Sequence, residues 1–126
     1  MTLFCSAYEF DSLCRDIADK AELLRLQAKG GSMAPFIKSG DWVDVVLVKG
    51  KNHDIKKGDI ILFRKDDSLY LHRVLRRAGE CFIAKGDMSL GHDGVIRRDD
   101  ILAKVVSIQS GERRVDLATR RNRCVA

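Results

Sequence analysis

A serine that follows two glycines is the first residue of this chain whose setting suits chemistry. Ser32 comes after Gly30-Gly31 and before Met33-Ala34-Pro35. Because glycine adopts tight backbone conformations freely, this segment can expose the serine oxygen and turn main-chain N–H groups toward a carbonyl. Pro35 fixes its own φ and stiffens the segment. Gly-Gly-Ser alone is a common loop sequence, so a nucleophile here needs support from the rest of the chain.

A histidine and two aspartates supply that support. His72 lies in an apolar stretch that predicts a strand, where a lone histidine is most simply a half-buried residue hydrogen-bonded to backbone. Asp87 and Asp93 lie in a polar loop after the next strand, which on its own is typical of a solvated turn. A neutral imidazole can accept the proton of a serine, and a carboxylate on its other ring nitrogen stabilises the imidazolium.

Taken together, these segments resemble the type I signal peptidase superfamily, which also includes the SOS-repressor-type serine peptidases. The pattern of that superfamily is Ser-Met-x-Pro, Gly-Asp, a second Gly-Asp before a strand, a strand with the catalytic base, and Lys-Gly-Asp. The chain has all of these in the same order: Ser32-Met33-Ala34-Pro35, Gly40-Asp41, Gly58-Asp59, His72-Arg73-Val74 and Lys85-Gly86-Asp87. The match spans residues 30–93, about half of the chain.

The resemblance implies a serine endopeptidase that acts by acyl transfer. A histidine at the base position is similar to the archaeal and endoplasmic-reticulum branch of signal peptidases, whereas the bacterial and SOS-type enzymes have a lysine. The resemblance implies that Ser32 is the nucleophile and His72 the general base. The assisting aspartate of that branch lies six residues after the Asp of Lys-Gly-Asp, which gives Asp93, with Asp87 as the alternative carboxylate. Small side chains near the cut are implied by the same resemblance.

The resemblance also implies a substrate and oxyanion segment made by Gly30, Gly31, Met33 and Pro35 around the nucleophile. Signal peptidases often have a serine two residues before the nucleophile, but this chain has Gly30. The oxyanion hole is therefore expected to use main-chain N–H groups. No membrane anchor and no Ala-Gly self-cleavage site are visible, and we expect no cofactor and no metal.

The sequence also allows three other interpretations. One is a catalytically inactive peptide-binding or regulatory module of the same fold, which Gly30 favours and the retained Ser32, His72 and Asp93 disfavour. A second is nucleic-acid binding, suggested by the net charge of +5 and the arginine-rich end, but aromatic residues make up only 6% and no nucleic-acid-binding motif is present. A third is a metal site whose candidate ligands match no known spacing. These ligands are His53, His72, His92 and Asp93.

The elements that position these residues are predicted to be one helix followed by strands. Residues 12–29 have apolar side chains three or four apart, which predicts an amphipathic helix with Asp11 as its N-cap. Strands are predicted at 42–48, 59–64, 68–75, 80–84, 101–108 and 113–117, separated by turn sequences. The predicted fold is mainly β, a signal-peptidase-like set of coiled antiparallel sheets or a barrel with one N-terminal helix.

The length of 126 residues predicts a single domain. We divide it into an N-terminal helical segment (1–29), a β-rich core (30–118) and a basic tail (119–126). The sequence shows no apolar run of membrane length and no secretory pattern, so a cytoplasmic location is expected, with all four cysteines as reduced thiols. The expected partner is a peptide or protein substrate, with a membrane-associated protein as a second option. We do not expect nucleic acid as a partner, and the sequence does not determine the oligomeric state.

Overall fold

The computed structural model describes residues 2–3, 23–30, 33–34, 36–48, 55–66, 68–87, 91 and 94–117. Within these residues the chain forms nine strands and one short 3-10 helix. They are β1 (Thr2–Leu3), β2 (Leu23–Lys29), β3 (Trp42–Leu47), β4 (Ile60–Lys65), β5 (Ser68–Ala78), β6 (Cys81–Lys85), β7 (Val95–Arg97), η1 (Arg98–Asp100), β8 (Ile101–Ser110) and β9 (Arg113–Asp116). The mainly β, antiparallel architecture predicted from the sequence is confirmed.

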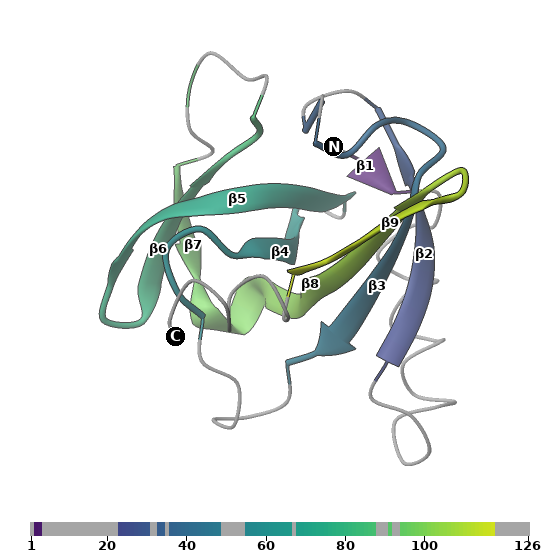
Figure 1. Ribbon diagram of the computed structural model, residues 1–126. Helices are drawn as coiled ribbons and strands as arrows, with labels where there is room; N and C mark the ends of the chain where they lie inside the picture. Colours follow the sequence, from purple (N-terminus) through teal and green to yellow (C-terminus); the bar gives the residue numbers. More distant parts are fainter. Residues whose placement is uncertain are drawn as a thin grey trace.

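The strands pair in the order β1-β2-β3-β8-β4-β5-β6-β7, with β9 on β8. β1 pairs with β2 and also with β5. Strand pairing therefore forms a closed ring of six strands, in the order β1, β2, β3, β8, β4 and β5. Figure 1 shows β2, β3, β8 and β9 on one side of the molecule and the long β5 with β6 and β7 on the other, with β4 between them. The C-terminal half of β5 extends beyond this ring and pairs with β6, which in turn pairs with β7.

Two apolar clusters fill the molecule, and β5 contributes to both. Alternate residues of a strand point to opposite faces. Leu69 and Leu71 accordingly belong to the first cluster, with the strands β2, β3, β4 and β8. Val74 belongs to the second cluster, with Phe82 and Ile96 from β6 and β7, and Tyr70 packs against it. The register of β5 therefore decides which of its side chains meets which part of the molecule.

The predicted N-terminal helix is wrong where the structure describes it. Residues 23–29 form strand β2, and residues 4–22 lie outside the described residues. The apolar residues Leu24, Leu26 and Ala28 also alternate with period two, and all three are buried in the first cluster. Pairing of β2 with β3 satisfies the backbone while burying that face, so tertiary contacts outweigh the helical spacing that Leu24 and Ala28 share with earlier residues.

The other predicted strands are confirmed within a few residues, but the sequence analysis missed β1, β2 and β7. β1 and β7 have only two and three residues, too short to show a period. Cys81, the one cysteine in the described part of the chain, is a free thiol, as expected. No helix among the described residues has the length and apolar character needed to span a membrane.

Candidate functional site

The segment around the candidate serine, residues 30–35, is called the nucleophile segment below. It is anchored in the core at Met33, the residue directly after the serine. Met33 is fully buried in the first cluster, and its main-chain oxygen accepts a hydrogen bond from the N–H of Ile37 (3.0 Å). Gly31, Ser32 and Pro35 lie outside the described residues. Gly30 is exposed with φ of 98°, a backbone conformation that favours glycine. Since the side chain of Met33 is buried, only its main chain remains for the predicted role beside a substrate.

His72 lies in the middle of β5, paired with Ile61 of β4. Its side chain is buried, with 5% of the residue exposed. The rings of Phe63 and Tyr70 lie beside it, with centroids 5.8 and 6.0 Å from that of the imidazole. These three residues come from the face of β4 and β5 that carries the second cluster. The imidazole is thus held by aromatic neighbours in a setting with little water.

The next residue, Arg73, points to the opposite face and joins three segments of the site. Its Nε and Nη2 atoms each donate to one carboxylate oxygen of Asp87, both at 3.0 Å. Its Nη1 atom donates to the main-chain oxygen of Gly58 (3.1 Å). Its guanidinium also lies over the ring of Phe36, 4.9 Å from the ring centroid. A bidentate pair of this kind fixes direction as well as distance, so Arg73 orients all three segments relative to β5.

A second contact brings the nucleophile segment to the Lys-Gly-Asp segment. The N–H of Asp87 donates to the sulfur of Met33 at 3.4 Å, across 54 residues of sequence. Met33 follows Ser32 directly, and Arg73 follows His72 directly. The segments that carry the predicted nucleophile, base and Lys-Gly-Asp motif therefore converge on Asp87. Nearby, Lys85 donates from its Nζ to the oxygen of Gly86 (3.1 Å).

The two Gly-Asp motifs form turns that lock the strands around this site. In one, the N–H of Gly40 donates to the oxygen of Ala28, and the N–H of Ala28 donates to the oxygen of Asp41, both at 2.8 Å. In the other, Gly58 and Asp59 hold Val74 of β5 in the same way, at 2.8 and 2.7 Å. One turn thus fixes the end of β2 just before the nucleophile segment, and the other fixes β5 just after His72 and Arg73.

The predicted site residues fall into two groups. Gly30, Met33, His72 and Asp87 are described, and the contacts above bring the segments of Met33, His72 and Asp87 together. Gly31, Ser32, Pro35 and Asp93 lie outside the described residues, and so do His53 and His92 from the set of candidate metal ligands. Among the described residues, no three His, Cys, Asp or Glu side chains are placed to hold a metal ion. The sequence analysis assigned no role to Arg73 or Phe36, because nothing local connects an arginine with a carboxylate 14 residues away.

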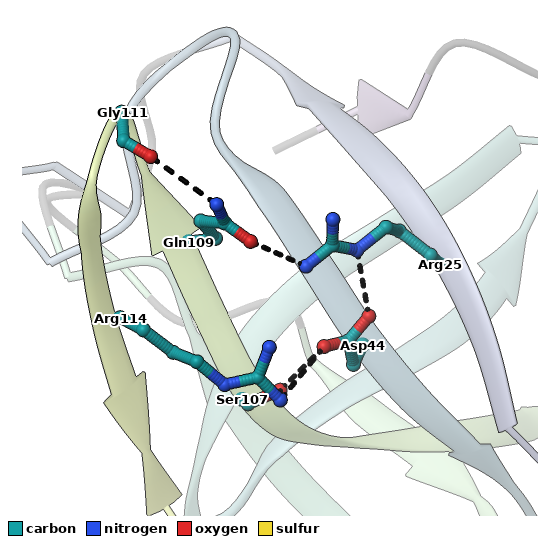
Figure 2. A network of polar contacts seen from close by, with 6 residues as sticks. All are labelled: Arg25, Asp44, Ser107, Gln109, Gly111 and Arg114. Atoms are coloured by element: carbon teal, nitrogen blue, oxygen red, sulfur yellow. Dashed lines mark hydrogen bonds and ion pairs between the residues drawn. The ribbon is translucent and has the colours of Figure 1, made fainter.

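A separate polar network lies over β2, β3, β8 and β9 (Figure 2). At its centre, Asp44 accepts hydrogen bonds from Arg25 Nε (3.0 Å) and from the Ser107 hydroxyl (2.6 Å), and Arg114 lies 3.5 Å away. Burial by itself would raise the pKa of the Asp44 carboxyl, but these hydrogen bonds and the charges of both arginines together lower the pKa below its ordinary 3.8. This network ties the β8–β9 hairpin to β3 and β2.

The sequence matches one known protein family over the segments that meet at Asp87. The chain matches the family described as Peptidase S24-like over residues 5–90, which include both Gly-Asp turns, β5 and Asp87. No curated protein matches it. The matched segment is more than half of the 126 residues and contains every described residue that converges on Asp87. The chain therefore belongs to the Peptidase S24-like family.

Proposed function

We propose that this protein is a serine endopeptidase in which Ser32 is the nucleophile, His72 the general base and Asp93 the carboxylate that orients His72. The observation that carries the proposal is the convergence on Asp87. Met33, next to Ser32, accepts the hydrogen bond of its N–H, while Arg73, next to His72, binds its carboxylate. Two contacts thus restrain the residues adjacent to the nucleophile and the base.

The register of β5 supports access to His72. β1 pairs with β5 at Tyr70, and β6 pairs with β5 from Arg73 onward. His72 therefore lies at the junction of these two neighbours, on the edge of β5 opposite β4. A loop can approach the strand at such a junction without breaking a ladder of strand hydrogen bonds.

The surroundings of His72 suit a base that starts neutral. Burial among the rings of Phe63 and Tyr70 makes a charge costly unless a partner compensates it. Asp87 is poorly placed for that role, because both of its oxygens bind Arg73, which points away from the face of His72. This favours Asp93 over Asp87 as the carboxylate that stabilises the imidazolium formed during the reaction.

The reaction follows from these roles. Ser32 Oγ attacks the carbonyl carbon of a peptide bond as its proton passes to His72, and main-chain N–H groups near Gly30 stabilise the oxyanion. The C–N bond breaks, and His72 returns the proton to the leaving amine. Water, deprotonated by His72, then attacks the acyl-enzyme, and the released serine regains its proton. The substrate is a peptide or an extended segment of a protein, and the reaction as written uses no cofactor.

The test compares cleavage by the full chain and its variants. The proteins are incubated with a mixture of synthetic peptides rich in alanine and glycine, and the products are identified by mass spectrometry. Ser32→Ala and His72→Ala should each reduce cleavage by about 10³-fold or more. Ser68→Ala, a half-buried serine at the start of β5, is the matched control and should keep wild-type activity. Cleavage by Ser32→Ala at the wild-type rate would exclude the proposal.

The pH profile identifies the base. If His72 accepts the proton, kcat/KM should rise as pH passes through about 6 to 7, the ordinary range of histidine. A rise only above about pH 8.5 would indicate a lysine, and Lys85 would be the first to test by Lys85→Met.

A catalytically inactive peptide-binding module is the second candidate. Gly30 favours it, because glycine supplies no hydroxyl where signal peptidases often have a serine. Under this alternative no peptide would be cleaved, and Ser32→Ala would bind peptides as well as the wild type does. A peptide that the wild type cleaves and Ser32→Ala does not cleave separates the two, because an inactive module cleaves none.

A further inference from the structure

A cavity of about 380 Å³ opens between the loop after the nucleophile segment and the β8–β9 hairpin. Three apolar side chains line it: Phe36, Ile108 and Val115. The other lining residues are Ser110 and three residues with charged side chains, Lys38, Asp41 and Arg113. The volume is within the usual range of pockets that bind small ligands or single side chains.

Both walls of the cavity are held by hydrogen bonds. On the loop side, the N–H of Lys38 donates to Oδ2 of Asp41 (2.8 Å), and the N–H of Asp41 donates to the oxygen of Lys38 (3.0 Å). On the hairpin side, Arg114, the neighbour of Arg113, contacts Asp44 and Ser107 (Figure 2). A ligand would therefore meet a preformed site, and little entropy would be lost in ordering the walls.

The charges of the cavity favour an anion. Lys38 and Arg113 are exposed, and neither side chain forms an ion pair with any residue that the structure describes. Asp41 is buried, with one of its oxygens occupied by the N–H of Lys38. The lining thus carries two cationic groups and one anionic group, next to the ring of Phe36 and the side chain of Val115. A carboxylate beside an apolar group complements this lining.

Phe36 links the cavity to the candidate site. The same side chain lines the cavity and lies under the guanidinium of Arg73, which holds Asp87. Phe36 is also only four residues after Ser32 in the sequence. A peptide segment in the cavity would therefore lie beside the loop that carries the nucleophile.

We propose that this cavity is a secondary binding site for the peptide substrate and takes a carboxylate next to an apolar side chain. The carboxylate pairs with Lys38 and Arg113, and the apolar side chain packs on Phe36 and Val115. The carboxylate comes either from a Glu or Asp side chain or from a free peptide C-terminus. The inference rests on the proposed function for its role in substrate selection, but binding itself requires no cleavage.

The experiment measures peptide binding to the full-length Ser32→Ala protein, so that cleavage does not interfere. Fluorescein-labelled Ser-Gly-Glu-Leu-Gly-Ser amide is compared by anisotropy with a twin in which Gln replaces Glu. A third peptide has Gln and a free C-terminal Leu carboxylate. The Glu peptide should bind about 3- to 10-fold more tightly than its Gln twin, which corresponds to one partly screened ion pair. Tighter binding of the third peptide than of the Glu peptide assigns the cavity to a C-terminus instead of a side chain.

Variants locate the binding. Arg113→Gln and Lys38→Gln should each remove most of the difference between the Glu and Gln peptides. Arg76→Gln, an exposed arginine of β5 outside the cavity lining, is the control and should leave it unchanged. Equal binding of all three peptides, or wild-type selectivity in Arg113→Gln, would overturn the proposal. Selective binding by a chain that cleaves nothing would keep this site and reject the peptidase, whereas cleavage without selectivity would do the reverse.

Discussion

Two turns of this protein share one short sequence pattern and one geometry. Lys38-Ser39-Gly40-Asp41 and Lys56-Lys57-Gly58-Asp59 both read Lys-x-Gly-Asp. The glycines have φ of 95° and 93°. In each turn the aspartate Oδ2 accepts the N–H of the lysine at 2.8 Å, and the aspartate N–H donates to the lysine oxygen at 3.0 Å. Each turn also exchanges a pair of main-chain hydrogen bonds with one strand residue.

The two turns differ in what surrounds them. The first holds Ala28 at the end of β2, and its Asp41 lines the cavity beside Arg113. The second holds Val74 of β5, and the oxygen of Gly58 accepts a hydrogen bond from Arg73. Asp59 also pairs with Lys104 of β8 at 3.4 Å. Four residues therefore determine the shape of each turn, while its neighbours determine whether the turn supports β5 or borders a cavity.

The largest change in activity is expected for Arg73→Lys, which tests whether the second turn supports the candidate site through Arg73. Arg73→Lys keeps the charge but loses the bidentate contact with Asp87 and the bond to the Gly58 oxygen. We expect kcat to fall about 10- to 100-fold with KM little changed, because small displacements of catalytic groups slow the reaction. Steady-state kinetics measure this on a peptide that the wild type cleaves. The shape of the pH profile of kcat/KM should stay the same.

Arg76→Lys is the matched control for that prediction and should keep wild-type kinetics. The positioning role of Arg73 would be rejected if Arg73→Lys changed KM alone, or if it lost stability and activity in proportion.

The next effect distinguishes the aspartates of the two turns. Asn at either position still offers an oxygen to the lysine N–H. Among the described residues Asp59 forms an ion pair with a lysine and Asp41 forms none, so Asp59→Asn removes a paired charge. Asp59 has a side chain only 2% exposed, so Asp59→Asn should lower the free energy of unfolding by about 1–3 kcal/mol. Asp41→Asn should lower it by less than about 1 kcal/mol. Urea denaturation measures both.

A double-mutant cycle with Lys104→Gln checks whether the Asp59–Lys104 ion pair causes the larger loss of stability in Asp59→Asn. In the Lys104→Gln background, the cost of Asp59→Asn should shrink toward that of Asp41→Asn. Equal costs in both backgrounds would mean that the ion pair does not distinguish the two turns.

A smaller change in stability is expected when the glycine of either turn is replaced by alanine, and the two changes should be equal if the turns have the same backbone geometry. Gly40→Ala and Gly58→Ala each place a Cβ in a backbone conformation with positive φ, and neither Cβ meets another atom within 4 Å. Each should therefore cost about 1–2 kcal/mol from backbone strain alone, with the two values equal within about 0.5 kcal/mol. Thermal or urea unfolding of the two variants measures this. A difference above about 1 kcal/mol would show that the turns are not locally equivalent.

The smallest effect concerns Asp44, a carboxylate outside both turns. Its pKa is lowered in the folded protein, so its stabilising contribution is present above the unfolded value near 3.8 and is lost as pH falls through the lower folded value. At pH 7, Asp44→Asn should lower stability by about 0.5–1 kcal/mol, because Arg25 and Arg114 remain half exposed to water. As pH falls below about 4, the stabilities of the variant and the wild type should converge, and a constant gap would contradict the lowered pKa.

The sequence predicted the antiparallel strands from residue 42 onward except the three-residue β7, since alternation and turn residues are local signals. It failed at residues 23–29, where Leu24 and Ala28 fit a helical face as well as a strand face. There the strand prevails because β3 supplies both hydrogen-bonding partners and a buried surface. The predictions that Ser32 and Asp93 are catalytic remain predictions, because both lie outside the described residues.

By itself, the sequence determined the family, through motifs in a fixed order, and the local shape of the Lys-x-Gly-Asp turns. Glycine and aspartate impose that shape within four residues, through the positive φ of the glycine and the short reach of the carboxylate. Only the tertiary structure decided that Arg73, Asp87, Phe36 and Met33 meet, and that Phe36 also borders a cavity. Such contacts join residues up to 54 positions apart, and they depend on strand register, which no local propensity encodes.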